Sequence, residues 1–520
     1  MTKNNIGDKF GASKSKNKFL VPISFKSYYN LSKLIVLESV NNILLEEQDI
    51  LSSAPSFQLL QIHLSSSEHG RNTPISLPKI FYYQNQLKMV ELSGFKFGGI
   101  LPRWLLENNT GLLTLTLTKN SISKPFRLPS SPMTELVTLD ISNNDFYGVI
   151  PYKIGNSFPM LKLLNMSRNK FEGVILSSLG NMTSLSILDL SNNQLSSKIP
   201  IHLVMGCSFL EVLKLSSNNL TGPMLPFQNN LPNLWLLLLD DNKFTEIPRY
   251  LSNSSGLKML NLSHNHLKGV FLVEFCQFDG LQLLDLSDNN FTGTIPSYFN
   301  VEDLKQIQLS NNRLNGPFSE VFHQLMNNLI IIELSNNHFN GSIPNWIDSL
   351  SWLSILILKN NHFESNIPYQ ICHLSRLMLI DLSSNKFSSN IPSYLNNITF
   401  DKENELGLLL RPTSQIVEAP LKNNLMIYSR RGYSMLGINI YILLANETFF
   451  SSHVEFTTKG IALLFTREPL LLFSAIDLSN NKLAGRIPPE IGNLSKIKAL
   501  NLSYNNLIGG IPTTFSKLQI

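Results

Sequence analysis

The chain is 520 residues long, which exceeds the size of one compact core, so it either divides into domains or repeats a smaller unit. It carries 42 Lys and Arg against 37 Asp and Glu, and beyond the first twenty residues the basic residues are scattered along the sequence. This distribution argues against a nucleic acid partner. No run of eighteen apolar residues occurs, so no membrane-spanning helix is predicted within these residues.

The N-terminal segment, residues 1–33, is predicted to be irregular. Its apolar stretch is only seven residues long and is interrupted by Pro22, whereas a secretory signal peptide needs a longer one. Two degenerate copies of a repeat are then expected over 34–86, beginning at Leu34 and Leu59, with Ser39 in a leucine position and Ser67 in an asparagine position.

Residues 87–400 hold thirteen regular copies of the pattern L-x-x-L-x-L-x-x-N-x-L, with steps of 23 to 25 residues. Their first positions are Leu87, Leu112, Leu136, Leu161, Leu185, Leu210, Leu234, Leu257, Leu281, Leu304, Leu329, Leu353 and Leu377. In each copy the two leucines of L-x-L share one face of a short strand, and only stacking on neighbouring copies can bury that face.

The pattern therefore predicts an α/β-type leucine-rich-repeat solenoid, a right-handed superhelix or horseshoe with parallel strands on its concave face. Strands are expected at 139–141, 188–190, 284–286 and 380–382. The asparagine of each copy follows the strand where the chain turns inward, and its amide can both donate to and accept from backbone groups that water does not reach. These asparagines should form a ladder: Asn144, Asn169, Asn193, Asn218, Asn242, Asn265, Asn289, Asn312, Asn337, Asn361, Asn385, Asn481 and Asn505.

The repeat is interrupted at 401–472 and resumes at Phe473 and Ile497, so 473–520 holds two more copies. The interval has enough Tyr and Phe to pack, and a long insertion in a solenoid often carries function. The sequence stops at "TTFSKLQI", within a repeat, which we interpret as a fragment or a truncated gene product.

Three stretches resemble one family: "KLAGRIPPEIGNLSKIKAL" from Lys482, "PRWLLENNTGLLTLTLTKNSIS" from Pro102 and "VEFTTKG" from Val454. Over roughly residues 20 to 520 the chain resembles plant leucine-rich-repeat receptor-like proteins, which have a repeat ectodomain, one transmembrane helix, a short tail and no kinase. It departs from them in lacking a signal peptide, paired cysteines in caps at both ends, and a membrane helix.

The resemblance implies that 401–472 is the island insertion of this family. Lys459 and Gly460 of its characteristic segment are kept, while Phe450 and Phe465 stand where tyrosines are characteristic. Phenylalanine preserves the packing area and loses one hydrogen bond of roughly 1 kcal/mol. Lys459 can pair with an acidic group of a ligand or co-receptor, or it can be a solvated lysine in a turn.

Between the leucine pairs, the residues on the concave face are mostly polar, as a solvated face requires. Leu239 and Ile357 are predicted to be exceptions on this face, with Trp235 near Leu239. An exposed apolar patch of these three residues is a candidate peptide contact. The alternative is drift between repeats, without function.

Other constellations have structural explanations. Cys276 and Cys372 lie four repeats apart, or about 19 Å, too far for a disulfide, so these thiols and Cys207 should be buried and free. The pair His264 and His266 flanks a ladder asparagine. No nucleophile, phosphate loop, dinucleotide or metal-ligand motif is present, so we expect no enzymatic activity, no cofactor and no metal.

Thirteen N-x-S/T sequons occur, a small excess over chance for a chain so rich in Asn, Ser and Thr. If the protein enters the secretory route, glycans should favour Asn108, Asn181, Asn253 and Asn493. Asn165, Asn261 and Asn501 lie on expected concave strands and should be disfavoured.

These features favour the ligand-recognition ectodomain of a plant cell-surface receptor, on the extracellular face of the plasma membrane, with a role in defence or development. It would bind a peptide or protein ligand and use leucine-rich-repeat receptor kinases as adaptor and co-receptor, and would meet the membrane only through a helix outside this sequence. The alternatives are a secreted inhibitor of a microbial cell-wall hydrolase and a nonfunctional gene remnant.

Overall fold

The structure is a computed structural model. It describes residues 9–12, 20–22, 25–40, 43–45, 54–66, 75–226, 231–248, 256–270, 275, 278, 280–296, 299, 301–324, 328–398, 426–427, 434–435, 454–458, 461–465, 474–494 and 496–518. The chain divides into two compact units, Met1–Leu267 and Lys268–Ile520, which are described separately below.

In the first unit, eleven short strands pair in parallel, each with the next along the chain. They are β1 (Lys9–Ala12), β3 (Val36–Val40), β5 (Gln61–Ser65), β6 (Met89–Ser93), β8 (Thr114–Thr116), β10 (Thr138–Asp140), β12 (Leu163–Asn165), β14 (Ile187–Asp189), β16 (Val212–Lys214), β18 (Leu236–Leu238) and β20 (Met259–Asn261).

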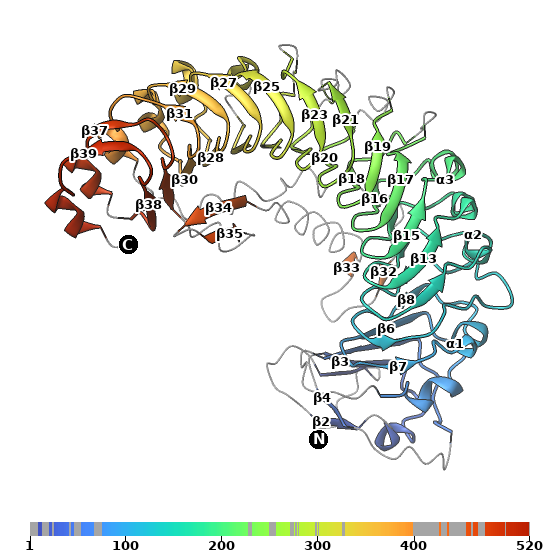
Figure 1. Ribbon diagram of the computed structural model, residues 1–520. Helices are drawn as coiled ribbons and strands as arrows, with labels where there is room; N and C mark the ends of the chain where they lie inside the picture. The colour runs from blue at the N-terminus through green and yellow to red at the C-terminus, as the bar shows by residue number, and fades with distance from the viewer. Residues whose placement is uncertain are drawn as a thin grey trace. The chain divides into compact units, whose positions relative to one another are not determined.

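The second unit continues the same pattern with seven parallel strands (Figure 1). They are β22 (Leu283–Asp285), β24 (Gln306–Gln308), β26 (Ile331–Glu333), β28 (Ile355–Ile357), β30 (Leu379–Asp381), β36 (Ala475–Asp477) and β38 (Ala499–Asn501). β30 pairs directly with β36, although residues 401–472 lie between them in the sequence.

The predicted leucine-rich-repeat solenoid is confirmed by this arrangement, because each copy supplies one strand and consecutive copies are neighbours. The four predicted strands are present and parallel, but each begins and ends one residue earlier than expected. Backbone pairing nevertheless continues one residue beyond the strand: the Ile141 N–H donates to the Asn165 carbonyl at 2.9 Å.

The core of each turn is built from the leucines that point inward from the strands and from a column of aromatic rings. Leu139, Leu164 and Leu188 have no exposed surface. In the second unit, the Phe363 ring stacks between Phe339 and Phe387, with centroids 6.3 Å apart on each side. Fully burying such a side chain stabilises the fold by roughly 1.5–3 kcal/mol, so stacking of turns supplies what a single turn lacks.

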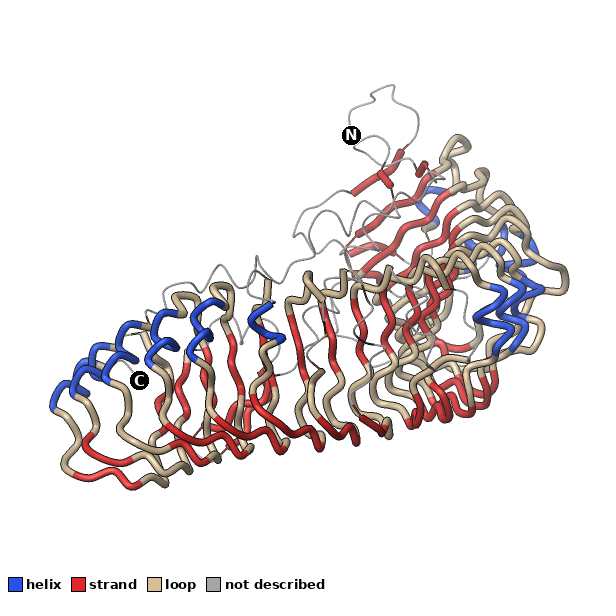
Figure 2. Tube along the Cα trace, turned by 90° about the horizontal axis from the view of Figure 1, so that it is seen from above, coloured by secondary structure: helices blue, strands red, loops and turns tan. Residues whose placement is uncertain are grey.

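Smaller parallel sheets form where the chain leaves each main strand (Figure 2). In the first unit these are β7 (Gly98–Gly99) with β9 (Ser121–Ile122), and the series β11 (Tyr147–Val149), β13 (Lys170–Val174), β15 (Gln194–Ser197), β17 (Asn219–Pro223) and β19 (Lys243–Glu246). In the second unit they are β21 (Lys268–Val270), β23 (Asn290–Gly293), β25 (Arg313–Pro317), β27 (His338–Gly341), β29 (His362–Ser365) and β31 (Lys386–Phe387), followed by β37 (Ala484–Arg486) with β39 (Asn506–Ile508).

Short helices complete the turns. In the first unit they are η1 (Lys26–Tyr28), η2 (Lys79–Tyr83), α1 (Arg103–Asn108), α2 (Ile154–Ser157), η3 (Ser177–Asn181) and α3 (Ile201–Gly206). In the second unit the described helices are α4 (Val321–Gln324), η6 (Asn345–Ser349), η7 (Tyr369–His373), η8 (Ser393–Asn397), η9 (Pro489–Asn493) and η10 (Thr513–Lys517). A Cβ added at Gly180 would lie 2.0 Å from the His202 carbonyl oxygen, which explains why glycine is required where these helices stack.

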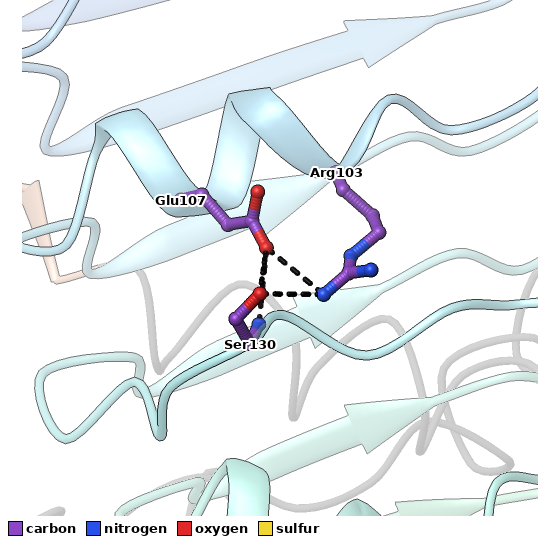
Figure 3. A network of polar contacts seen from close by, with 3 residues as sticks. All are labelled: Arg103, Glu107 and Ser130. Carbon is purple, nitrogen blue, oxygen red and sulfur yellow. Dashed lines mark hydrogen bonds and ion pairs between the residues drawn. The ribbon is translucent and has the colours of Figure 1, made fainter.

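Polar contacts also join neighbouring turns on the outside of the solenoid. Ser130 Oγ accepts a hydrogen bond from Arg103 Nη2 at 2.6 Å and donates one to Glu107 Oε1 at 2.6 Å (Figure 3). The hydrogen bonds from the Ser130 side chain and backbone lower the pKa of Glu107, helped by Arg103. This cluster links α1 to the following turn, so its role is structural.

The N-terminal prediction is wrong in one respect, because part of 1–33 is regular. β1 pairs in parallel with β3, and β2 (Leu20–Pro22) pairs in parallel with β4 (Ile43–Leu45). The backbone of β3 offers an unpaired hydrogen-bonding edge, and β1 satisfies it without needing the leucine pattern on which the prediction relied.

Within 401–472, only four short strands are described. β32 (Met426–Ile427) pairs antiparallel with β33 (Ser434–Met435), and β34 (Val454–Thr458) pairs antiparallel with β35 (Ile461–Phe465). The boundaries proposed for the segments of the chain, including the insertion at 401–472, stay a prediction.

Candidate functional site

The ladder asparagines are saturated by backbone contacts. Asn337 is representative: its Nδ2 donates to the carbonyls of Leu309, Leu334 and Ser335 at 2.8–3.2 Å, and its Oδ1 accepts from the Leu314 N–H at 2.9 Å. Asn120 holds the same position in an earlier copy and was missed by the sequence analysis, although "TKNSIS" places it at the right distance from Leu112. This saturation leaves the ladder no capacity for a ligand.

The strand face, defined as the side of the main sheet that points away from the leucine core, offers a surface of regular chemistry. In the second unit, the first outward residues of the seven strands form an apolar row with one polar member: Leu283, Gln306, Ile331, Ile355, Leu379, Ala475 and Ala499. The second outward residues form a parallel row, named the acidic row because four of its seven members are Asp or Glu: Asp285, Gln308, Glu333, Ile357, Asp381, Asp477 and Asn501.

From β22 to β36 this face is buried, contrary to the expectation of a solvated concave surface. From β22 to β36, no outward residue of either row is more than 8% exposed. Close lateral packing of strands about 4.8 Å apart accounts for part of this burial.

The predicted exposed apolar patch is therefore wrong. Leu239 faces the core with no exposed surface, because the residue between the leucines of that copy is Leu238, which is half-buried. Ile357 does point outward from β28, yet it is also fully buried, and Trp235 is only 7% exposed. The three residues present no apolar surface to solvent.

Burial shifts the protonation of the acidic row. Desolvation, reinforced by the neighbouring Asp477 carboxylate, raises the pKa of Asp381 to about 7. Asp381 Oδ1 accepts from the Ser383 N–H at 3.0 Å and the Ser383 hydroxyl at 2.5 Å, whereas Oδ2 has no hydrogen-bond partner among the residues that the structure describes. In the first unit, desolvation likewise raises the pKa of Asp140 to about 6.

The candidate residues of the insertion can be placed only in part. Phe450, Lys459 and Gly460 lie outside the described residues. Lys459 and Gly460 fall in the connection between β34 and β35, and Phe465 is the last residue of β35. Their roles stay a prediction.

The described cysteines have a structural role, and the described histidines form no metal site. Cys207 and Cys372 are free and buried, and burial raises the pKa of their thiols to about 12 and about 11. Cys276 lies outside the described residues. Among the residues that the structure describes, no group of three His, Cys, Asp or Glu side chains could hold a metal ion, and no helix has the length and apolar character needed to cross a bilayer.

The glycosylation candidates differ in exposure. Asn108, Asn181 and Asn493 are exposed at helix ends, while Asn253 lies outside the described residues. Asn165 and Asn261 are half-buried on main strands of the first unit, and Asn501 is half-buried on β38 of the second. Glycan occupancy itself stays a prediction.

Comparison with known proteins agrees with this geometry. Models of the leucine-rich repeat match residues 232–291 and, separately, 135–157, 160–182, 184–204, 328–350, 474–494 and 496–518. Cuscuta receptor 1 of Solanum lycopersicum is 36% identical over 126 residues, which are 24% of this chain and 11% of that protein. Receptor-like protein 13 of Arabidopsis thaliana is 41% identical over 104 residues, 20% of this chain and 9% of that protein.

Solved structures resemble a much larger part of the chain. The PEPR1–AtPEP1 crystal structure matches with a TM-score of 0.69 and 25% identity, covering 96% of this chain and 62% of the other. The Arabidopsis HAESA ectodomain, solved with an extended IDA peptide hormone, matches with a TM-score of 0.63 and 26% identity over 97% of this chain and 75% of that chain.

The fold, the asparagine ladder and these matches define a plant-type leucine-rich-repeat protein. More narrowly, the chain is a relative of the plant leucine-rich-repeat receptor-like proteins. The matched stretches span only about a tenth of the length of the curated relatives named above.

Proposed function

We propose that this chain is the ligand-recognition ectodomain of a plant cell-surface receptor-like protein, without enzymatic activity of its own. The observation that carries the proposal is the pair of outward rows on β22 to β38, one apolar and one acidic, in register across seven strands. The rows are buried from β22 to β36, so a peptide would meet their apolar and acidic side chains only at the margins of this face and beside the insertion. This favours a segment with apolar and basic residues together with an acidic group for Lys459.

We further propose that the insertion at 401–472 packs on this buried strand face and forms the ligand site together with it. The burial of Ile357 and Asp381, which point away from the core, supports this part of the proposal. The unbroken pairing of β30 with β36 supports it too, because both ends of the insertion then leave the same edge of the solenoid.

The relatives support a peptide ligand and a co-receptor. One HAESA structure contains the peptide hormone IDA and the co-receptor SERK1, and it matches this chain with a TM-score of 0.59 and 26% identity. By analogy, this ectodomain would bind a peptide or protein and signal through partner receptor kinases in defence or development. The plasma membrane location and N-linked glycans belong to the same proposal.

Two alternatives remain to be distinguished by experiment: a secreted inhibitor of a microbial cell-wall hydrolase, and a nonfunctional gene product. The inhibitor would bind a hydrolase directly, with no co-receptor. Loss of turnover in a hydrolase assay on adding the purified chain would favour it over the receptor.

The test selects peptides from a random library on the whole chain and measures their affinity for three variants. Deleting 401–472 and the single change Lys459→Glu should each weaken binding roughly tenfold or more, about 1.4 kcal/mol. The matched control Lys498→Glu changes an exposed lysine outside the insertion and should leave binding unchanged. Selected peptides that bind the deletion variant as tightly as the whole chain, or a selection that yields no peptide, would overturn the proposal.

A further inference from the structure

A line of basic side chains runs along the second unit on a surface separate from the strand face. The residue directly after the ladder asparagine is basic in five consecutive turns. These residues, which we name the basic stripe, are Arg313, His338, His362, Lys386 and Lys482. All five are exposed.

Local geometry directs these side chains outward at a constant spacing. Arg313, His338, His362 and Lys386 are the first residues of β25, β27, β29 and β31, and Lys482 lies two residues before β37 (Figure 1). In every turn the next residue is a buried Leu or Phe of the core, so alternation along the strand sends the basic side chain to solvent.

The spacing is set by the solenoid. Neighbouring parallel strands lie about 4.8 Å apart, and the imidazole rings of His338 and His362 stack with centroids 5.7 Å apart. His338, His362 and Lys386 are each in register with the residue two positions after the preceding stripe member, so the stripe crosses the strands obliquely with one basic group for each turn.

Little nearby charge opposes the stripe. None of the five side chains of the stripe forms an ion pair with a described residue. The positions two residues further along the strands are Asn315, Asn340, Glu364, Ser388 and Ala484, so Glu364, which pairs in register with Lys386, is the one carboxylate in that adjacent row.

We propose that the basic stripe binds a linear anionic polysaccharide, a chain of uronic acids that carries one carboxylate on each sugar. The stripe offers one basic group for each turn, and its two histidine rings lie 5.7 Å apart, so carboxylates along one polymer can meet successive turns. The adjacent asparagine amides and serine hydroxyl can accept or donate hydrogen bonds to the sugar hydroxyls. This proposal does not depend on the proposed peptide site.

The chemistry of the stripe favours this polymer over two other polyanions. Binding of single-stranded nucleic acid uses aromatic side chains on which bases stack, and the stripe and the adjacent row contain no Phe, Tyr or Trp. Binding to an anionic membrane is strengthened by exposed apolar side chains, and the adjacent row is polar or small.

The interaction is electrostatic, so affinity for a polycarboxylate should fall with added salt.

The test measures binding of the whole chain, freed of N-linked glycans because the sequon at Asn340 borders the stripe, to a galacturonic acid oligosaccharide of about ten sugars. The stripe variant carries Arg313→Gln, His338→Gln, His362→Gln, Lys386→Gln and Lys482→Gln. The control variant carries the same number of changes at exposed lysines elsewhere: Lys88→Gln, Lys153→Gln, Lys198→Gln, Lys243→Gln and Lys498→Gln. Thermal unfolding shows whether each variant folds.

At pH 5.5 and low salt, the stripe variant should lose at least tenfold in affinity, while the control variant loses less than threefold. A neutral oligosaccharide of equal length should not bind. Equal losses in the two variants would mean that net charge alone attracts the polymer, and would overturn the proposal. Tighter binding of a single-stranded oligonucleotide or of anionic vesicles than of the uronic acid chain would overturn it as well. If the stripe variant does not fold, the pair Arg313→Gln and Lys386→Gln replaces it, with a threefold loss expected.

Discussion

Asn481 contacts Leu382 across 99 residues of sequence: its side-chain Nδ2 donates to the Leu382 carbonyl at 3.0 Å. In return, its Oδ1 accepts from the Phe387 N–H at 3.0 Å. These are the same two contacts that ladder asparagines make between copies adjacent in sequence. The turn that ends near 398 and the turn that begins near 474 are thus neighbours in the solenoid, and the pairing of β30 with β36 keeps its register.

Replacing one ladder asparagine should destabilise the solenoid far more than replacing an exposed one. Asn337→Ala leaves the buried Leu314 N–H without its acceptor and removes one of two donors from each of three carbonyls, and we expect a loss of roughly 1–3 kcal/mol in the free energy of unfolding. Asn315→Ala, at an exposed position that is not part of the ladder, should cost less than about 0.5 kcal/mol. Urea unfolding followed by circular dichroism measures both, and equal midpoints for the two variants would contradict the ladder's role.

The repeat fold could be predicted almost completely, because the period of Leu and Asn states which residues face the core and where the chain turns. The exposure of the strand face could not. Ile357 was placed on the correct side of its strand, but its burial depends on tertiary packing that the repeat pattern does not encode. Leu239 was assigned to the wrong side because four consecutive leucines, from Leu236 to Leu239, hide the phase of that copy.

The basic stripe was missed for a different reason. Its first four members are 24 or 25 residues apart and Lys482 lies 96 residues after Lys386, so a search for clustered charge finds only scattered residues. The signal was available once the ladder was aligned, because Arg313, His338 and His362 each follow a ladder asparagine directly. In a solenoid, surface patches are found by comparing the residues at one equivalent position of successive repeats.

Stability should depend on pH through Asp381. Its pKa in the fold is raised to about 7 by desolvation and by Asp477, above the value of about 3.9 for an unfolded chain, so the folded state holds a proton that the unfolded state has lost. Stability therefore increases as pH falls from about 7.5 to 5.5, by roughly 2 kcal/mol for this group. Asp381→Asn keeps an acceptor for Ser383 and removes the titration, so its unfolding midpoint should change less over this range. The exposed control Asp241→Asn should keep the wild-type slope, and an Asp381→Asn variant with an unchanged slope would contradict the assignment.

Glycan occupancy should follow the engagement of the acceptor amide. Asn165 Nδ2 donates to Asp140 at 3.2 Å and Asn501 Nδ2 donates to Asp477 at 3.0 Å, and both are half-buried on main strands. Asn108 and Asn493 are exposed at the ends of short helices. Glycopeptide mapping of secreted protein should find high occupancy at the exposed pair and low occupancy at Asn165 and Asn501. Full occupancy of the strand sites would count against a ligand surface on the strand face.

The central claim is that the turns before and after 401–472 stack directly on each other, although the insertion separates them in the sequence. A disulfide cross-link tests this claim most directly. Asp381 and Asp477 are in-register neighbours on β30 and β36, within the range of Cα separations that a disulfide spans. The chain carries Asp381→Cys and Asp477→Cys together with a protease site placed in 401–472, and is cleaved and analysed under non-reducing denaturing conditions. The control pair Glu333→Cys and Asp477→Cys lies three strands apart, at about 14 Å, beyond the reach of a disulfide. If β30 and β36 are neighbours, the two fragments stay covalently joined in the first variant and separate in the control. Fragments that separate in both variants would show that the turns on either side of the insertion are not neighbours, and would contradict this claim.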